Sequence, residues 1–194
     1  MDKKKLFDLI LFIGNKVNKF KSGSLKVNKL IWFIESEAYR TRGRTITGVD
    51  FVALPKGPVM DNYKALFSEM ESLGLIECSY SDAGRKLFST KKDTALDRLE
   101  DGEKLIVEHF ISGFKDLGEA TLEGMSHKDA WNITLHESNN KFGEIIDMDL
   151  VLLESNPFKN LPIVTDEDSR ELKKIAENLP SSCMSSITTL KEAS

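Results

Sequence analysis

Apolar residues recur at helical spacing from the start of the chain. Over residues 2–20, successive apolar positions lie three or four apart, and further apolar neighbours widen the stripe. The positions that define it are Leu6, Ile10, Ile13, Val17 and Phe20. A stripe this wide predicts a helix that is buried on more than one side and that ends before the Ser-Gly pair at 22–23.

A second helix is predicted over residues 25–41. Ser24 is a suitable N-cap residue and Gly43 a natural C-terminal stop. The residues that share one face of this helix are Val27, Leu30, Ile31, Ile34 and Ala38. The two segments therefore predict a pair of helices that supply much of the core.

The next segment reads as a helix followed by a hairpin. Met60 or Asp61 opens a helical pattern that Gly74 ends. Residues 75–80 then alternate between apolar and polar, residues 81–84 have the composition of a turn, and residues 86–90 return as a second strand. A helix followed by a hairpin resembles a winged-helix element.

The rest of the chain gives a weaker helical pattern. It begins at Thr94, with an interruption at Asp101-Gly102, and continues to Phe114. The segment 126–129 reads as a capping box that opens a short helix through Trp131, because a serine is followed three positions later by an acid. Residues 145–153 fit a helix and a strand equally well.

These elements predict a mainly α protein: a compact helical domain with a small β-hairpin. We expect the domain to cover residues 1–155. Residues 156–194 are first acidic and then rich in Ser and Thr, which is typical of a loosely docked or partly mobile extension.

The irregular segment 43–59 is unusually rich in glycine and proline. Three glycines and two prolines occur within these seventeen residues, between two predicted helices. Because both residue types impose special backbone angles, this density predicts a fixed path rather than a flexible linker. An extended stretch is expected around 51–54.

Composition places the chain among globular proteins of a reducing compartment. Of its 194 residues, 40% are hydrophobic and 30% are charged. The sequence contains no window of about 18 apolar residues, the length that a membrane-spanning helix needs. Its two cysteines, Cys78 and Cys183, form no spaced motif, which favours the cytoplasm over a disulfide framework.

Charge is distributed unevenly. Residues 1–48 contain eleven Lys and Arg against four Asp and Glu, whereas residues 49–194 contain sixteen against twenty-seven. Either the two regions neutralise each other in the fold, or they form a basic patch for nucleic acid or an acidic face for a basic protein.

Candidate catalytic chemistry is sparse. His127 and His136 are nine positions apart, which fits no common metal-ligand spacing, and Cys78 lies within a predicted strand. Ser126 directly precedes His127, so their side chains point apart and no Ser–His relay follows. We expect no catalytic site, metal or cofactor, and an enzyme with an unrecognised site is only a distant alternative.

A nucleic-acid-binding regulator is the stronger alternative. Basic residues of the first 44 positions could form one surface, and a helix with a wing could enter a DNA groove. These residues are Lys16, Lys19, Lys21, Lys26, Lys29, Arg40, Arg42 and Arg44. The second helix is mostly apolar, however, and the acidic balance of the chain opposes approach to phosphates.

Three blocks of sequence together resemble a known family. They are Lys26-x-Asn28-Lys29-Leu30-x-x-Phe33, Gly43-Arg44-x-Ile46-Thr47-Gly48-x-x-Phe51-x-Ala53-x-x-x-Gly57-Pro58-Val59 and Ser126-His127-x-x-x-Trp131. In this order they resemble the Panacea antitoxin domain family, also described as SocA-like or as the phage-associated GepA-like domain. The resemblance extends over residues 5–135.

The resemblance implies an antitoxin of a two-gene toxin–antitoxin system, which neutralises its cognate toxin by direct protein–protein binding. It implies no enzyme activity and no cofactor. The motif residues become candidates for fold determination or for partner binding: Lys26, Asn28, Lys29, Phe33, Thr47, Gly48, Phe51, Gly57, Pro58, Val59, His127 and Trp131.

Specific contacts can be expected for some of these candidates. We expect Lys26, Asn28 and Lys29 to meet the Gly/Pro segment, with Asn28 bonding to loop backbone. His127 and Trp131 would close the same region from the last matched helix. Operator DNA remains the alternative partner, and toxin contacts could lie instead on other surfaces, including the acidic tail.

Overall fold

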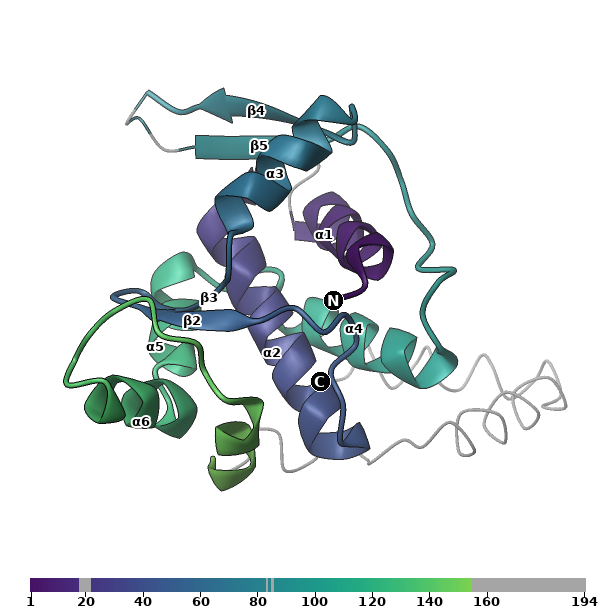
Figure 1. The fold of residues 1–194 in the computed structure, drawn as a ribbon. Coiled ribbons are helices and arrows are strands. Elements are labelled where there is room, and N and C mark those ends of the chain that lie inside the picture. The colour runs from purple at the N-terminus through teal and green to yellow at the C-terminus, as the bar shows by residue number, and fades with distance from the viewer. Residues whose placement is uncertain (18–21, 83, 85, 155–194) are drawn as a thin grey trace, which may run out of the picture.

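A computed structural model describes residues 1–17, 22–82, 84 and 86–154 (Figure 1). The helices are α1 (Lys3–Val17), α2 (Ser24–Arg42), α3 (Tyr63–Ser72), α4 (Asp101–Phe114), α5 (Glu119–Ser126), α6 (Asp129–Glu137) and the 3-10 helix η1 (Met148–Leu153). The strands are β1 (Ser22–Gly23), β2 (Phe51–Leu54), β3 (Gly57–Met60), β4 (Ile76–Tyr80) and β5 (Lys86–Thr90). This mainly helical architecture confirms the predicted fold class.

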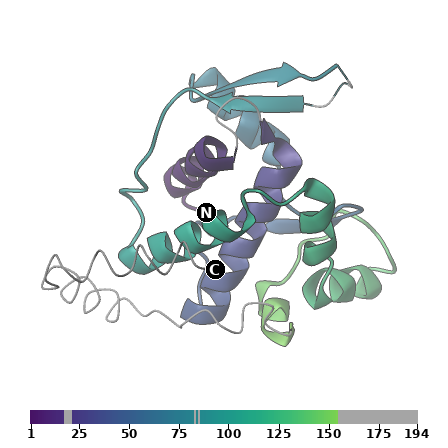
Figure 2. The same ribbon diagram turned by 180° about the vertical axis from the view of Figure 1, so that it is seen from behind.

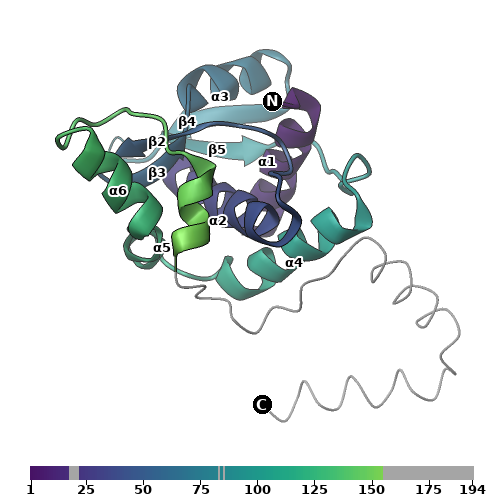
Figure 3. The same cartoon turned by 60° about the horizontal axis from the view of Figure 1, so that its bottom comes forward.

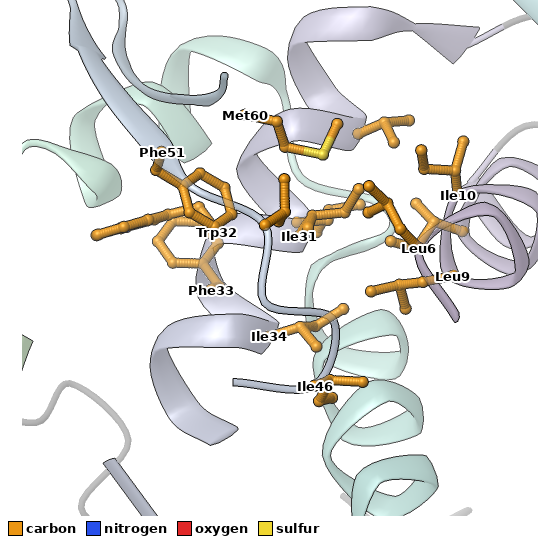
Figure 4. Packing of buried hydrophobic residues seen from close by; sticks show 14 of the residues in the cluster. Leu6, Leu9, Ile10, Ile31, Trp32, Phe33, Ile34, Ile46, Phe51 and Met60 are labelled. Carbon is orange, nitrogen blue, oxygen red and sulfur yellow. The ribbon is translucent and has the colours of Figure 1, made fainter. Parts of the chain in front are cut away.

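Helix α2 is the centre of the molecule, and every residue from Val27 to Ala38 is buried. Figure 4 shows apolar side chains of α1 pointing toward those of α2, with Ile46 and Met60 beside them. The wide stripe predicted for α1 is confirmed, because Leu6, Leu9, Ile10 and Ile13 are completely buried. Each such side chain contributes roughly 1.5–3 kcal/mol to folding.

Helix α4 lies across α2 (Figure 2). Phe33 of α2 packs against Phe110 and Phe114 of α4, with ring centroids 6.4 and 5.7 Å away. The predicted helical start at Thr94 is wrong, and so is the interruption at 101–102. The helix begins at Asp101 because Glu100 forms a capping box with Glu103.

Two further capping predictions are wrong. Ser126 ends α5 instead of opening α6, because its hydroxyl donates to the backbone carbonyl of Glu123 at 2.8 Å. Lys128 occupies the N-cap of α6. Ser24 is the first residue of α2 rather than its N-cap, which is Gly23.

The predicted hairpin is present and carries a third, short strand. Strands β4 and β5 pair antiparallel with Cys78 opposite Phe88, and β1 pairs with the other edge of β5. The small sheet therefore has the order β1-β5-β4. In Figure 1 it lies beside α3 at the top of the molecule.

A second hairpin was not predicted. The extended stretch at 51–54 is confirmed as β2, but it pairs with β3, and Met60 belongs to that strand rather than to the start of α3. The connection is the two-residue turn Pro55-Lys56. The ambiguous segment 145–153 contains both structure types, because Ile145 forms a β-bridge with Val52 and η1 follows it.

The path from Gly43 to Val49 is fixed by one buried carboxyl group. Glu35 of α2 is completely buried. It accepts hydrogen bonds from the backbone N–H of Ile46 at 2.6 Å and from the N–H and hydroxyl of Thr47 at 3.1 and 2.5 Å. Burial raises the pKa of Glu35 to about 7, against the opposing effect of these donors.

No helix within the described ranges is long and apolar enough to span a membrane. The helical positions predicted at 18–20 and the proposed extension 156–194 lie outside the described residues.

Replacing Glu35 separates hydrogen bonding from volume. Glu35→Ala leaves three buried donors without an acceptor, so we expect it to lower the free energy of unfolding by about 3 kcal/mol. Glu35→Gln keeps the size and one carbonyl oxygen, so a loss of about 1 kcal/mol is expected. Urea denaturation measures both values, and a loss below about 1 kcal/mol for Glu35→Ala would show that other contacts hold the loop.

Candidate functional site

The hairpin β2–β3 is held from one side by two neighbouring residues of α2. Asn28 accepts a hydrogen bond from the backbone N–H of Met60 at 3.0 Å, and the ammonium group of Lys29 donates to the carbonyl of Pro58 at 2.8 Å. Both side chains are buried. They occupy the edge of β3 that β2 does not cover, so α2 takes the place of a neighbouring strand. Asn28 bonds to backbone as expected, but its partner Met60 belongs to β3 and lies one residue beyond the Gly/Pro segment.

The other side of the hairpin is held by the junction of α5 and α6. The indole N–H of Trp131 donates to the carbonyl of Leu54 at 3.0 Å, and the imidazole of His127 lies next to the backbone of Lys56. The rings of His127 and Trp131 stack with centroids 4.2 Å apart. The turn of the hairpin therefore lies between α2 and this junction, as expected for His127 and Trp131.

Gly57 is the point where these groups converge. Its φ of 86° lies in the left-handed region that favours glycine. A Cβ atom placed there would lie 2.5 Å from the Ser126 hydroxyl oxygen, 2.6 Å from the Lys29 ammonium nitrogen and 2.8 Å from Cδ2 of His127. Only glycine fits this position without displacing its neighbours.

Two titratable groups lie in this cluster, and burial shifts both toward the neutral form. Burial lowers the pKa of Lys29 to about 7, while the charge of nearby Glu123 opposes the shift. Burial also lowers the pKa of His127, and the positive charge of Lys29 lowers it further. Nε2 of His127 is buried and has no hydrogen-bond partner within the described part of the chain.

Asn28, Lys29, His127 and Trp131, which we call the clamp, hold the hairpin in place and do not form a reactive centre. Lys29 is completely buried and Ser126 is 1% exposed, so neither offers its reactive atom to solvent. The Ser126 hydroxyl is directed to the backbone carbonyl of Glu123 instead of to His127. Across the described residues, no three His, Cys, Asp or Glu side chains are grouped so as to hold a metal ion.

The remaining candidates lie in three different environments. Phe51 packs edge-on against Trp32 at 5.0 Å, whereas Val59 pairs with Val52 and is buried on the opposite face of the hairpin. Thr47 belongs to the separate network around Glu35, as Phe33 belongs to the contact with α4. Phe33 and Phe51 therefore belong to the main hydrophobic core.

Two candidates are placed away from the hairpin. The expectation that Lys26 meets the Gly/Pro segment is wrong, because its ammonium group donates to the carbonyl of Lys115, beyond the end of α4. Gly48 has a φ of 68° and lies close to the backbone of Met1. The N-terminus is tied to this loop, since the N–H of Asp2 donates to the carbonyl of Thr47 at 2.6 Å.

Sequence reasoning missed Glu35. The available signal was an acid within the apolar stretch of α2, since buried carboxyl groups need donors and the Gly/Pro segment offers backbone N–H groups. Met60, whose backbone N–H bonds to Asn28, was also assigned to the wrong element.

The sequence matches the model of a known protein family. The model of the family described as Antitoxin SocA-like, Panacea domain, matches residues 27–132, which is more than half of the chain. The chain belongs to this family. The suspected resemblance is thereby confirmed. No curated protein and no solved structure matches the chain.

The Panacea domain match spans both halves of the clamp. It begins at Val27, next to Asn28 and Lys29, and ends just after Trp131. It leaves out α1 and Lys26 at one end, and the segment 133–154 at the other. The hairpin and the residues that hold it are therefore part of the family domain, whereas the 3-10 helix η1 lies outside it.

Substitution of Gly57 tests whether its neighbours in the Panacea domain leave room for a side chain. Gly57→Ala adds a methyl group to crowded space at positive φ, and we expect it to lower the free energy of unfolding by about 3 kcal/mol. The control is Gly43→Ala. Gly43 has a φ of 69°, but a Cβ atom added there would meet no atom within 4 Å, so only the backbone cost of about 1 kcal/mol applies. Equal losses in thermal or urea unfolding would contradict the crowding.

The pH dependence of stability tests the burial of Lys29. Because its pKa in the folded protein lies below the usual 10.5, the unfolded chain binds more protons between pH 7 and pH 10.5. Stability should therefore rise with pH across this window, by at most about 1.4 kcal/mol per unit. Lys29→Met should abolish that rise in urea unfolding, and an unchanged slope would show that Lys29 is solvated.

Proposed function

We propose that this Panacea-domain protein is the antitoxin of a two-gene toxin–antitoxin pair. It acts in the cytoplasm and neutralises a cognate toxin by direct protein–protein binding, without making or breaking a covalent bond. The observation that carries this proposal is the family match over residues 27–132. The buried, internally bonded state of the Lys29 cluster supports it, because a binding protein needs a rigid scaffold rather than an accessible reactive group.

We assign the motif residues to the scaffold. The side chains of Asn28, Lys29 and Trp131 already bond to the hairpin backbone, and Gly57 lies beneath them. Asn28, Lys29 and Gly57 are buried, so a toxin could reach them only by displacing the hairpin, whereas Trp131 is partly exposed. The partner contacts of this protein are therefore expected on its exposed surface.

The distribution of ion pairs favours a protein partner over DNA. Arg42 and Arg44 both pair with Glu100, and Arg40 pairs with Glu37 at 2.7 Å and with Glu154 at 3.7 Å. All three arginines of the basic N-terminal region are thus paired with acids. A DNA-binding surface needs such cations free to contact phosphates.

The helices near the wing also lack the features of a DNA reader. Helix α2 is buried in the core, and α3, which directly precedes the β4–β5 hairpin, exposes Glu71 and pairs Glu69 with Lys3. On the wing, Glu77 pairs with Lys91 at 2.6 Å. An acidic recognition helix would be repelled by the DNA backbone.

Co-expression tests the proposed function. The reading frame adjacent to this gene should arrest growth when expressed alone, and growth should be restored when this protein is made with it. The two products should form a stoichiometric complex on size-exclusion chromatography. Glu35→Ala, which is expected to loosen the scaffold, provides a negative control made at the same level.

Two results would contradict the antitoxin assignment. The neighbouring product could prove harmless alone, or it could still arrest growth when both proteins are present. Salt-dependent retention of this protein on DNA of its own operon, without a complex between the two products, would favour the regulator instead.

A further inference from the structure

The segment 133–154 lies beyond the family match and forms a layer on the hairpin and α2. Figure 3 shows α6, η1 and the segment between them beside β2 and α2. Among the described residues, eight large apolar side chains are exposed, and four of them belong to this segment: Phe142, Ile145, Leu152 and Leu153. Four exposed apolar side chains on one segment make it a candidate surface for interaction.

Residues 143–146 form the outer edge of the β2–β3 sheet. The N–H of Ala53 donates to the carbonyl of Glu144 at 2.9 Å. In return, the N–H groups of Gly143 and Ile146 donate to the carbonyls of Ala53 and Phe51, both at 2.8 Å. We call residues 143–146 the edge segment. Because β3 covers the other side of β2, and Asn28 and Lys29 of α2 occupy the outer edge of β3, this segment is the edge at which another strand could be added to that sheet as described.

The backbone of Ile145 is directed away from β2. The hydrogen bonds on either side of it make Ile145 and Val52 a non-hydrogen-bonded antiparallel pair. In such a pair, the N–H and C=O of each residue point to the outer edge of its strand. Neither group of Ile145 has a hydrogen-bond partner among the described residues. An unpaired edge of this kind is a template for a further strand.

The side chains around this edge are apolar at the centre and acidic nearby. Ile145 is 61% exposed and Phe142 48% exposed. Ile145 also lines a shallow depression of about 460 Å³, together with Glu137 and Glu144. A strand bound along this edge could place one apolar side chain against Ile145. The next side chain of that strand could then lie in or over the depression.

The charge of residues 133–154 indicates which kind of strand could bind to the edge segment. Residues 133–154 contain five acids and a single Lys or Arg, Lys141. Glu144 pairs with Lys141 and Glu154 with Arg40, so Glu137, Asp147 and Asp149 are the acids without an ion pair among the described residues. A second copy of the chain would bring two such acidic edges together, and like charges in contact are unfavourable. A basic segment would instead be attracted, with its association accelerated by the same charges.

We propose that the edge segment binds an extended stretch of the partner protein by strand addition. The stretch has apolar residues at its centre and is flanked by Lys or Arg. Main-chain hydrogen bonds to Ile145 supply affinity, and Ile145 and Phe142 supply apolar contact. The identification of this partner as the toxin rests on the proposed function.

A proline substitution tests the backbone contact directly. Ile145→Pro removes the outward N–H, while the bonds to β2 come from Gly143, Glu144 and Ile146, so the fold should be retained. The matched control Ile145→Thr keeps the N–H and the β-branched shape. With the purified product of the adjacent reading frame as probe, calorimetry should give at least a tenfold loss of affinity for Ile145→Pro. For Ile145→Thr the loss should be only a few-fold.

A charge variant keeps the test decisive if the proline variant fails to fold. Phe142→Lys combined with Ile145→Lys leaves the ladder intact and repels a basic segment, so it too should weaken binding at least tenfold. Binding by the wild-type chain should also weaken as salt is raised. Circular dichroism and thermal unfolding check that each variant is folded.

Three outcomes would overturn the proposal in different ways. If folded variants bind the probe as tightly as the wild-type chain, the toxin binds elsewhere and the antitoxin assignment stands. If the variants instead dissociate a dimer of this protein alone, the edge joins two copies of the chain. If the wild-type chain does not bind the probe, the edge proposal and the proposed function both fail.

Discussion

Buried polar side chains on the central helix govern this structure. A helix that is buried over twelve consecutive positions, Val27 to Ala38, would ordinarily be apolar throughout, yet it contains Asn28, Lys29 and Glu35. Each of these groups loses its hydration on folding, and each must find a partner inside the protein. The partners are backbone groups of the segment 46–60.

The same requirement explains why the Gly/Pro-rich segment follows a single path. Ile46 and Thr47 must present their N–H groups to Glu35, while Pro58 and Met60 must present a carbonyl and an N–H to the start of α2. A β-hairpin over residues 51–60 allows both sets of hydrogen bonds to form. Gly57 permits the close approach of Lys29 and His127 that such a path demands.

The molecule thus divides its tasks between two regions. Residues within the family match build a scaffold in which Asn28, Lys29 and Glu35 bond to backbone groups. The segment 133–154 covers one edge of that scaffold with exposed apolar and acidic side chains. For the proposed antitoxin function, a division of this kind would let the scaffold stay fixed while the covering segment changes. Binding would then require no rearrangement of the clamp.

The spacing of apolar residues predicted those helices and strands whose burial repeats regularly along the sequence. The stripe of α1, the face of α2 and the alternation of β4 and β5 were all readable from the sequence. Strand β3 was not, because it is buried on every residue and receives its bonds from side chains about thirty positions earlier. For the same reason Glu35 escaped notice, since its role depends on the backbone of a distant loop. The serine of the expected capping box instead bonded within the preceding helix.

Amide hydrogen exchange of the protein in solution tests the central claim most directly. The N–H groups of Ile46, Thr47 and Met60 bond to buried side chains of α2, so they should exchange as slowly as the amides of the α2 core. Ile145, whose N–H has no partner in the described part of the chain, should exchange rapidly. Rapid exchange at Ile46, Thr47 and Met60, at the rate of Ile145, would contradict the account.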